Sequence, residues 1–245
     1  MKIRLNKFLA DLGLASRRKA DALIEEGKVL LNGSKAKLGD KIDPSKDKLT
    51  VKGKIVALDQ KTELEYWLLN KPTQVISAVS DDSGRKTALD YLKSKTKARV
   101  YPVGRLDYDS EGLLLLTNDG ELAQRLTHPS YEVPKIYKVW AEGIFAPAKL
   151  ERLLRGVKLA EGRIAFDQIE VLEKEGRELT LRITIHQGVK REIRRACAKV
   201  GWEVTKLLRI QIGNLQLLGL IPGNVRKLTD EEIQDLRQSV GLANG

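Results

Sequence analysis

Four consecutive leucines at 113–116 are the feature that most constrains how this chain folds. A short, continuous apolar run bounded by turn-forming residues is typical of a buried strand. The run follows a charged, glycine-punctuated stretch, GRLDYDSEG, and ends in an Asn-Asp-Gly turn. Gly104 and Gly112 permit unusual backbone angles and the close approach of a ligand. The stretch is therefore either an ordinary loop that leads into a core strand or a loop that holds a carboxylate at a working site.

Composition predicts a globular protein of the cytoplasm with no part in a membrane. Of the 245 residues, 42% are hydrophobic and 31% are charged. No stretch reaches the about 18 to 20 apolar residues that a membrane span needs, and charges interrupt the N-terminal residues, which argues against a secretory signal. One cysteine, Cys197, excludes an intramolecular disulfide. Because only Cys197, His128 and His186 offer soft ligands, we expect no metal site and leave both histidines as structural.

The positive charge is concentrated in the first quarter of the chain. The formal net charge is +11, and residues 1–60 carry 14 Lys and Arg against 8 Asp and Glu. Basic surface of this kind commonly binds phosphate. The charge alone is also compatible with a basic face that is merely solvated.

Residues 1–57 are expected to form two helices and a small sheet. Apolar residues at helical spacing predict a first helix that ends at Gly13 and a second that Ser16 caps and Gly27 ends. The pair Asn32-Gly33 between two short apolar segments predicts a hairpin. Residues 58–64 are polar and are expected to be a linker.

Cations open the second helix, at Arg17-Arg18-Lys19, although the helix dipole disfavours positive charge there. A bound phosphate would offset that cost. Residues 3–53, with Gly27, Val29, Asn32 and Gly33 of a "G-x-V-x-V-N-G" pattern, resemble the S4-type RNA-binding domain first described in a ribosomal protein. The RNA-binding candidates in this region are Arg4, Lys7, Ser16, Arg17, Arg18, Lys19, Lys28 and Asn32.

From residue 65 to 240 we expect a larger domain of α+β class, built around a mixed, mostly antiparallel sheet with flanking helices. The expected strands are 66–71, 75–79, 113–117, 135–143, 178–188 and one or two within 204–217. The expected helices are 87–92, 121–128, 146–156 and 190–201, the last with Ile193, Ala196, Cys197 and Val200 on its apolar face.

Three functions are compatible with these residues. The first is a passive RNA-binding protein, the second is an enzyme that acts on RNA through a carboxylate in the turn at 104–112, and the third is a glycosidase that pairs Asp107 with Asp109 or Glu111. Spacing argues against the third, because carboxylates within one tight turn are hard to place on opposite sides of a sugar ring.

The stretch GRLDYDSEGLLLLTNDG closely resembles the signature of the pseudouridine synthases, in the branch that modifies single uridines of ribosomal RNA. The similarity extends from about residue 66 to 232. It implies that Asp107 is the nucleophile, that Arg105 takes the place of the flipped-out nucleotide in the RNA, and that Tyr137 stacks near the target base. It also implies that Arg194 pairs with Asp107, and that Leu208, or its neighbour Leu207, lines the pocket. The common family form has His-Gln where this chain has Arg191-Glu192, so the resemblance assigns that pair no role.

The activity that the resemblance implies is the isomerisation of a specific uridine to pseudouridine in ribosomal RNA. GELAQRLTHPSYEV favours the large-subunit over the small-subunit RNA. The alternative is a catalytically idle RNA-binding or ribosome-assembly protein of the same fold. We expect ribosomal RNA as the partner, no cofactor, no metal and a monomer.

Overall fold

The computed structural model describes residues 2–58 and 63–242, and the chain divides into two compact units, Met1–Leu64 and Glu65–Gly245. Each unit is described by itself. Residues 59–62 of the expected linker lie outside the described residues. None of the helices in the described ranges is long and apolar enough to cross a membrane.

The first unit is the two-helix and small-sheet module that the sequence predicts. Its helices are α1 (Leu5–Asp11) and α2 (Arg17–Glu25), and its strands are β1 (Ile3–Arg4), β2 (Val29–Leu31), β3 (Ser34–Lys35), β4 (Lys41–Ile42), β5 (Leu49–Val51) and β6 (Lys54–Val56). The sheet has the order β3-β2-β5-β6, and β1 pairs with β4. As predicted, Ser16 accepts a hydrogen bond from the Lys19 amide at the start of α2, and Asn32 and Gly33 both have positive φ in the β2–β3 turn.

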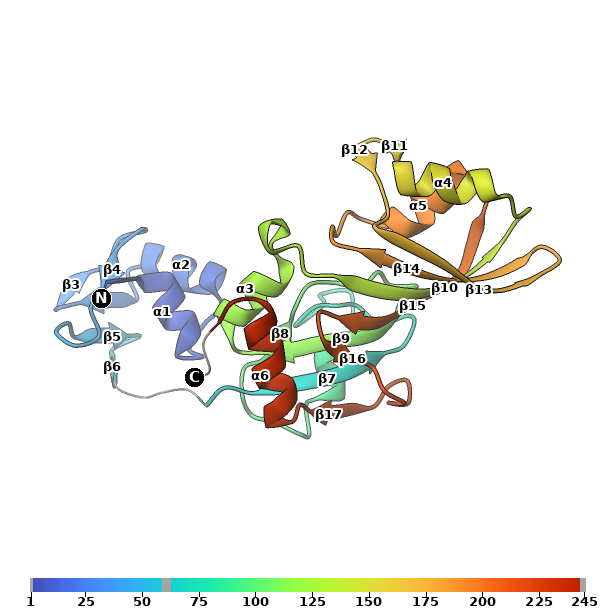
Figure 1. The fold of residues 1–245 in the computed structure, drawn as a ribbon. Coiled ribbons are helices and arrows are strands. Elements are labelled where there is room, and N and C mark those ends of the chain that lie inside the picture. The colour runs from blue at the N-terminus through green and yellow to red at the C-terminus, as the bar shows by residue number, and fades with distance from the viewer. Residues whose placement is uncertain (1, 59–62, 243–245) are drawn as a thin grey trace. The chain divides into compact units, whose positions relative to one another are not determined.

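The second unit is built on one large sheet, which confirms the α+β prediction (Figure 1). Its strands are β7 (Tyr66–Lys71), β8 (Tyr101–Pro102), β9 (Glu111–Thr117), β10 (Lys135–Glu142), β13 (Gln168–Glu175), β14 (Glu178–Ile185), β15 (Glu203–Ile212), β16 (Leu215–Gln216) and β17 (Val225–Lys227). The order is β13-β14-β10-β15-β9-β7-β17, with β16 on β15 and β8 on β9. Among the described strands, β9 and β15 form the one parallel pair, so the sheet is mixed and mostly antiparallel.

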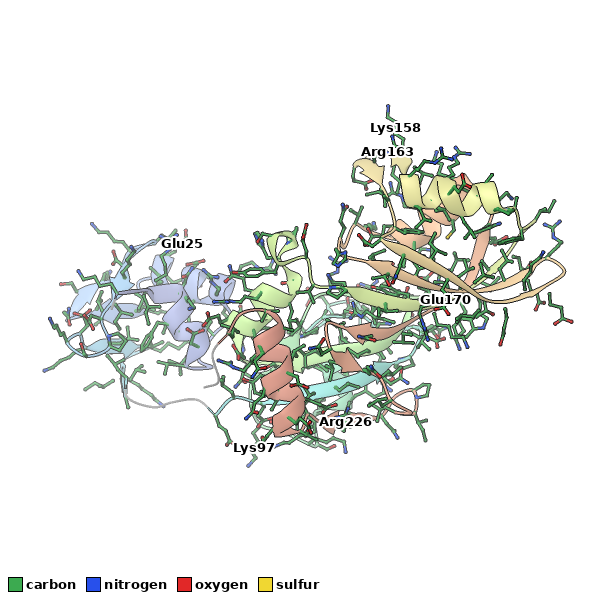
Figure 2. All side chains as sticks on the ribbon, viewed as in Figure 1. Glu25, Lys97, Lys158, Arg163, Glu170 and Arg226 are labelled. Atoms are coloured by element: carbon green, nitrogen blue, oxygen red, sulfur yellow. The ribbon has the colours of Figure 1, made fainter. Side chains whose placement is uncertain are left out.

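Helices cover both faces of this sheet. The remaining elements are α3 (Gly120–Thr127), α4 (Pro147–Arg155), α5 (Glu192–Lys199), α6 (Asp230–Ser239), the 3-10 turns η1 (Ala88–Tyr91) and η2 (Pro129–Tyr131), and the hairpin β11 (Val157–Leu159) and β12 (Gly162–Ile164). Buried residues of α4 and α5 join one apolar cluster, and those of α3 and α6 join another. The Lys158 side chain extends outward from the β11–β12 hairpin, whereas Arg163 Nε donates to the Arg155 carbonyl at 2.8 Å (Figure 2).

The leucine run is a central strand, as predicted. In β9, Leu114 and Leu116 contribute to the cluster beneath α4 and α5, whereas Leu113 and Leu115 contribute to the cluster beneath α3 and α6. All four are completely buried. A strand with apolar clusters on both faces has no polar side, and this explains why the run shows no alternation.

The prediction of a strand at 75–79 is wrong. The backbone of this segment joins no sheet, and its strand-like pairing is limited to one isolated bridge, between Ile76 and Thr87. The segment instead runs beside the loop before β9, because the Ser77 hydroxyl donates to the Leu106 carbonyl and accepts from the Leu106 amide, both at 3.0 Å. The segment contains apolar residues because Val75 is buried, and not because its backbone pairs with a strand.

Candidate active site

The loop that connects β8 to β9 carries Asp107, and neighbouring backbone holds it on several sides. Gly104 has φ +71°, the left-handed conformation that favours glycine. The Ser110 amide donates to the Asp107 carbonyl at 3.1 Å, and the Gln74 amide donates to the Tyr108 carbonyl at 2.7 Å. Together with the two hydrogen bonds of Ser77, these contacts fix the loop without using the Asp107 carboxylate.

A buried lysine that the sequence reasoning missed also holds this loop. Lys71, the last residue of β7, is fully buried, and its ammonium donates to the Ser110 carbonyl at 2.7 Å and the Pro72 carbonyl at 2.9 Å. Burial, helped by the positive charge of Arg209, lowers the pKa of Lys71 to about 8. The available signal was position, because Lys71 ends the expected strand YWLLNK, whose first four residues are apolar.

The partner of Arg194 is Asp109, which corrects the expectation that Arg194 pairs with Asp107. The Arg194 guanidinium donates to the Asp109 carbonyl at 3.1 Å and to the Val204 carbonyl at 2.6 Å, and its Nε lies 3.4 Å from Asp109 Oδ2. Arg191 Nη1 is 2.7 Å from Asp109 Oδ1. The loop turns tightly after Asp107, so the carboxylate that meets the start of α5 is that of Asp109. The hydrogen bond from Arg191, with the charge of Arg194, holds the pKa of Asp109 below its usual value.

Asp107, Arg105 and Tyr137 line one cavity of about 360 Å³. Tyr137 projects from β10 and is buried, whereas Arg105 is exposed and Asp107 is half-buried. Burial raises the pKa of the Tyr137 hydroxyl above its usual value, although the neighbouring Arg209 guanidinium opposes part of that shift. Three of the five synthase-domain candidates therefore share a cavity, and Arg194 lies outside its lining.

Leu207, and not Leu208, is the β15 leucine that lines this cavity. Successive side chains of a strand point to opposite faces, so only one of the two can face Asp107. Leu208 lines a separate hollow of about 750 Å³. The same alternation turns Arg209 toward the cavity, where it is 3% exposed and its Nε donates to the Leu113 carbonyl at 2.8 Å. The sequence analysis did not identify Arg209 as a site residue, although Arg209 lies on the same face of β15 as Leu207.

Lys135 and Glu192 also line the cavity. Lys135 donates to the Val133 and His186 carbonyls, both at 3.0 Å, and burial lowers its pKa. Glu192, the first residue of α5, is 5% exposed, and burial raises its pKa to about 7. His186 also lines the cavity, with Nδ1 3.0 Å from Asp167 Oδ2. Within the described ranges, His, Cys, Asp and Glu form no group of three that could hold a metal ion.

The RNA-binding candidates of the first unit differ in how free their side chains are. Arg17, Arg18 and Lys19 are exposed at the start of α2, and Lys7 is exposed on α1. The other four candidates already have contacts within the unit. Ser16 caps α2, and Asn32 donates to Asp47 and accepts from the Lys48 amide. Lys28 Nζ is 2.6 Å from Glu26 Oε2, and Arg4 donates to the Gly39 carbonyl at 3.5 Å. The RNA-binding role of all eight stays a prediction.

Comparison with known proteins agrees with this arrangement. The RNA pseudouridylate synthase family matches residues 65–199, and the S4 domain matches residues 3–47. The chain is 45% identical to the ribosomal large subunit pseudouridine synthase B of Bacillus subtilis (strain 168), over 96% of this chain and 95% of that protein. It is 36% identical to the dual-specificity RNA pseudouridine synthase RluF of Escherichia coli (strain K12), over 96% of this chain and 78% of that protein.

A solved structure described as a pseudouridylate synthase superimposes on nearly the whole chain. The TM-score is 0.67 at 28% sequence identity, and the match covers 96% of this chain and 99% of that one. The sequence match, the fold and the S4 domain lead to one conclusion: the chain belongs to the RNA pseudouridylate synthase family, in the branch that joins an S4 domain to the synthase domain, and it is an isomerase.

Proposed function

We propose that this protein converts a uridine of large-subunit ribosomal RNA to pseudouridine, with Asp107 as the nucleophile. The observation that carries the proposal is the cavity that Asp107, Arg105 and Tyr137 line together. The Bacillus relative, whose name states the large ribosomal subunit, supports that choice of RNA. We further propose that the protein acts as a monomer in the cytoplasm, and that it binds RNA through the exposed cations of its first unit.

The chemistry suits one positioned carboxylate. The reaction breaks the bond between C1′ and N1 and forms a bond between C1′ and C5, while C5 loses a proton and N1 gains one. No electrons leave or enter, so the isomerisation is redox-neutral. A carboxylate nucleophile divides such a reaction into easier steps. Since the side chain of Asp107 has no hydrogen bond or ion pair among the described residues, it is available to the nucleotide.

The target base must leave its stack to reach this carboxylate, which costs a few kcal/mol. Tyr137 offers an aromatic face inside the cavity, and stacking on it returns about 1–3 kcal/mol of that cost. Arg105 is exposed at the cavity, where its guanidinium can occupy the space that the nucleotide leaves in the RNA. Arg191 and Arg194 act on the loop through Asp109, and thereby position Asp107 indirectly.

The test is release of tritium from ribosomal RNA labelled at C5 of uridine, because C5 loses its hydrogen only when it becomes the glycosidic carbon. The wild type should release tritium, and Asp107→Asn should reduce the rate by about a thousandfold or more while RNA affinity stays nearly unchanged. Asp82→Asn, which changes an exposed carboxylate outside the cavity lining, is the matched control and should be fully active. Substantial turnover by Asp107→Asn would reject the mechanism, and a wild type that binds RNA without releasing tritium would favour the idle RNA-binding protein.

A further inference from the structure

Three residues that line the Asp107 cavity each carry a buried polar side-chain atom without a hydrogen-bond partner among the described residues. The atoms are Ser110 Oγ, Glu192 Oε2 and Arg209 Nη2. Their residues are 1%, 5% and 3% exposed. An unsatisfied buried polar group costs about 1–3 kcal/mol. Three such atoms at one cavity indicate that its lining is arranged for a polar ligand.

Glu192 is the least expected of the three, because a carboxylate is rarely buried without a cation. A backbone hydrogen bond from Val189 and the charge of Lys135 favour ionisation of Glu192, but the Lys135 ammonium donates to two backbone carbonyls and forms no ion pair with Glu192 in the described ranges. Asp167 adds a negative charge that opposes ionisation of Glu192. A buried salt bridge therefore does not explain this residue.

The charged and titratable groups around Glu192 come from several elements. Lys135 and Tyr137 lie on β10, Arg209 on β15, Arg105 and Asp107 on the loop before β9, and Asp167 and His186 beside the sheet ends. Lys190 and Arg191 directly precede Glu192 in the chain and line the same cavity. Burial dominates over all of them and raises the pKa of Glu192 to about 7. At neutral pH a large fraction of Glu192 is therefore a neutral carboxylic acid.

We propose that Glu192, a cavity-lining residue with an unpartnered buried carboxyl oxygen, positions the target base by hydrogen bonding to its uracil ring. This proposal rests on the proposed function. A carboxylic acid has an O–H donor beside a carbonyl acceptor. Uracil presents a carbonyl acceptor beside its N3–H donor, and enzymes that flip a base read this edge by hydrogen bonds. Arg209 Nη2 and Ser110 Oγ are further donors for the second carbonyl oxygen of the base.

An ionised Glu192 would lose this match. Both of its oxygens would then be acceptors, and the oxygen that had donated would face a carbonyl oxygen of uracil with a negative charge. A glutamine side chain keeps one donor and one acceptor at every pH. The proposal therefore distinguishes Glu192→Gln, which preserves the hydrogen bonds, from Glu192→Leu, which fills a similar volume without them.

The experiment measures tritium release from C5-labelled ribosomal RNA by the full chain at pH values from 6 to 8.5. Glu192→Leu should lower kcat/KM by about 10- to 100-fold at pH 6, as expected for lost hydrogen bonds to the base. Glu192→Gln should stay within about threefold of the wild type there. Between pH 6 and pH 8 the wild type should lose about tenfold relative to Glu192→Gln, because only the wild type titrates.

Glu175→Gln, on an exposed residue of β13, is the matched control and should follow the wild type at every pH. Thermal unfolding of each variant establishes that it is folded. Equal activity of Glu192→Leu and the wild type would overturn the proposal, and so would equal losses in the Leu and Gln variants. Tritium release by the wild type tests the proposed function separately, since the Glu192 role is judged only from the ratios of variants to an active wild type.

Discussion

Gly112 occupies the position where an added methyl group should do most damage to the candidate active site. It lies in β9 between two buried cations, since its backbone pairs with Lys71 in β7 and with Arg209 in β15. Its φ is +107°, which side chains rarely adopt. A Cβ at this position would overlap the Arg209 carbonyl oxygen, and it would lie 2.7 Å from the Arg209 amide nitrogen and 2.9 Å from Leu208 Cδ1.

These distances give the magnitude for Gly112→Ala. A non-glycine residue in the left-handed region costs about 1–2 kcal/mol, and overpacking a close-packed interior costs typically about 1–3 kcal/mol. The neighbours are backbone atoms of a paired strand, which cannot rotate away as the end of a side chain can. We therefore expect the free energy of unfolding to fall by about 2–5 kcal/mol. Activity should fall as well, because Arg209 and the Asp107 loop must move apart.

Gly84→Ala separates the two contributions. Gly84 has φ +73°, and a Cβ there would meet no atom within 4 Å, so only the backbone cost of about 1–2 kcal/mol applies. Urea unfolding gives the stabilities, and tritium release from C5-labelled RNA gives the activities. The reasoning is refuted if Gly112→Ala loses no more stability than Gly84→Ala and retains full activity.

Two cations that hold the Asp107 loop, the cations of the first unit and the redox-neutral chemistry give four further predictions. Arg194→Ala should lose most activity and about 2–3 kcal/mol of stability in urea, because two carbonyls of the loop and of β15 lose a charged donor; an active, stable variant would contradict this role. Burial lowers the pKa of Lys71 to about 8, so the folded state releases this proton before the unfolded state does as pH rises. The wild type should accordingly gain about 2 kcal/mol relative to Lys71→Met between pH 7 and 9.5, and a constant difference in unfolding free energy would show that the cation is not buried. Replacing Arg17, Arg18 and Lys19 together by alanine should reduce the slope of log affinity against log salt by about 2–3, and an unchanged slope in filter binding would exclude them from the phosphate contacts. Tritium release should continue in EDTA once the RNA is folded, and a loss that added zinc or magnesium restores beyond any effect on RNA folding would reject the single-carboxylate mechanism.

Local patterns predicted the elements of this fold well. The leucine run, the apolar face of α5 and the Asn32-Gly33 turn each depend on residues close in sequence, and all three are confirmed. The strand prediction for 75–79 was wrong for a related reason, because an apolar run can be buried without pairing in a sheet. Short runs of this kind are ambiguous wherever a hydroxyl such as that of Ser77 offers the backbone another partner.

Nonlocal contacts could not be read from the sequence. Nothing near Glu111 indicates that β9 pairs in parallel with β15, about a hundred residues later, yet this pairing brings Arg209 beside the Asp107 loop. The sequence of β15 predicts that alternate side chains share a face, but it does not show which set faces the cavity. Leu208 was therefore preferred, although Leu207 lines the cavity. The motif likewise located Arg194 without showing which of two nearby aspartates it meets.

Four cations at or beside the cavity share one feature: each donates to a backbone carbonyl. Lys71 donates to the Ser110 carbonyl, Arg209 to the Leu113 carbonyl, Arg194 to the Asp109 carbonyl and Lys135 to the His186 carbonyl. Each positive charge is thus fixed by backbone oxygens rather than by the Asp107 carboxylate. A carboxylate that is already paired would have to break its hydrogen bonds before it attacks, whereas fixed charges that surround an unpaired carboxylate need no rearrangement during the reaction. The arrangement therefore favours an Asp107 that is positioned by its loop and left free for the nucleotide.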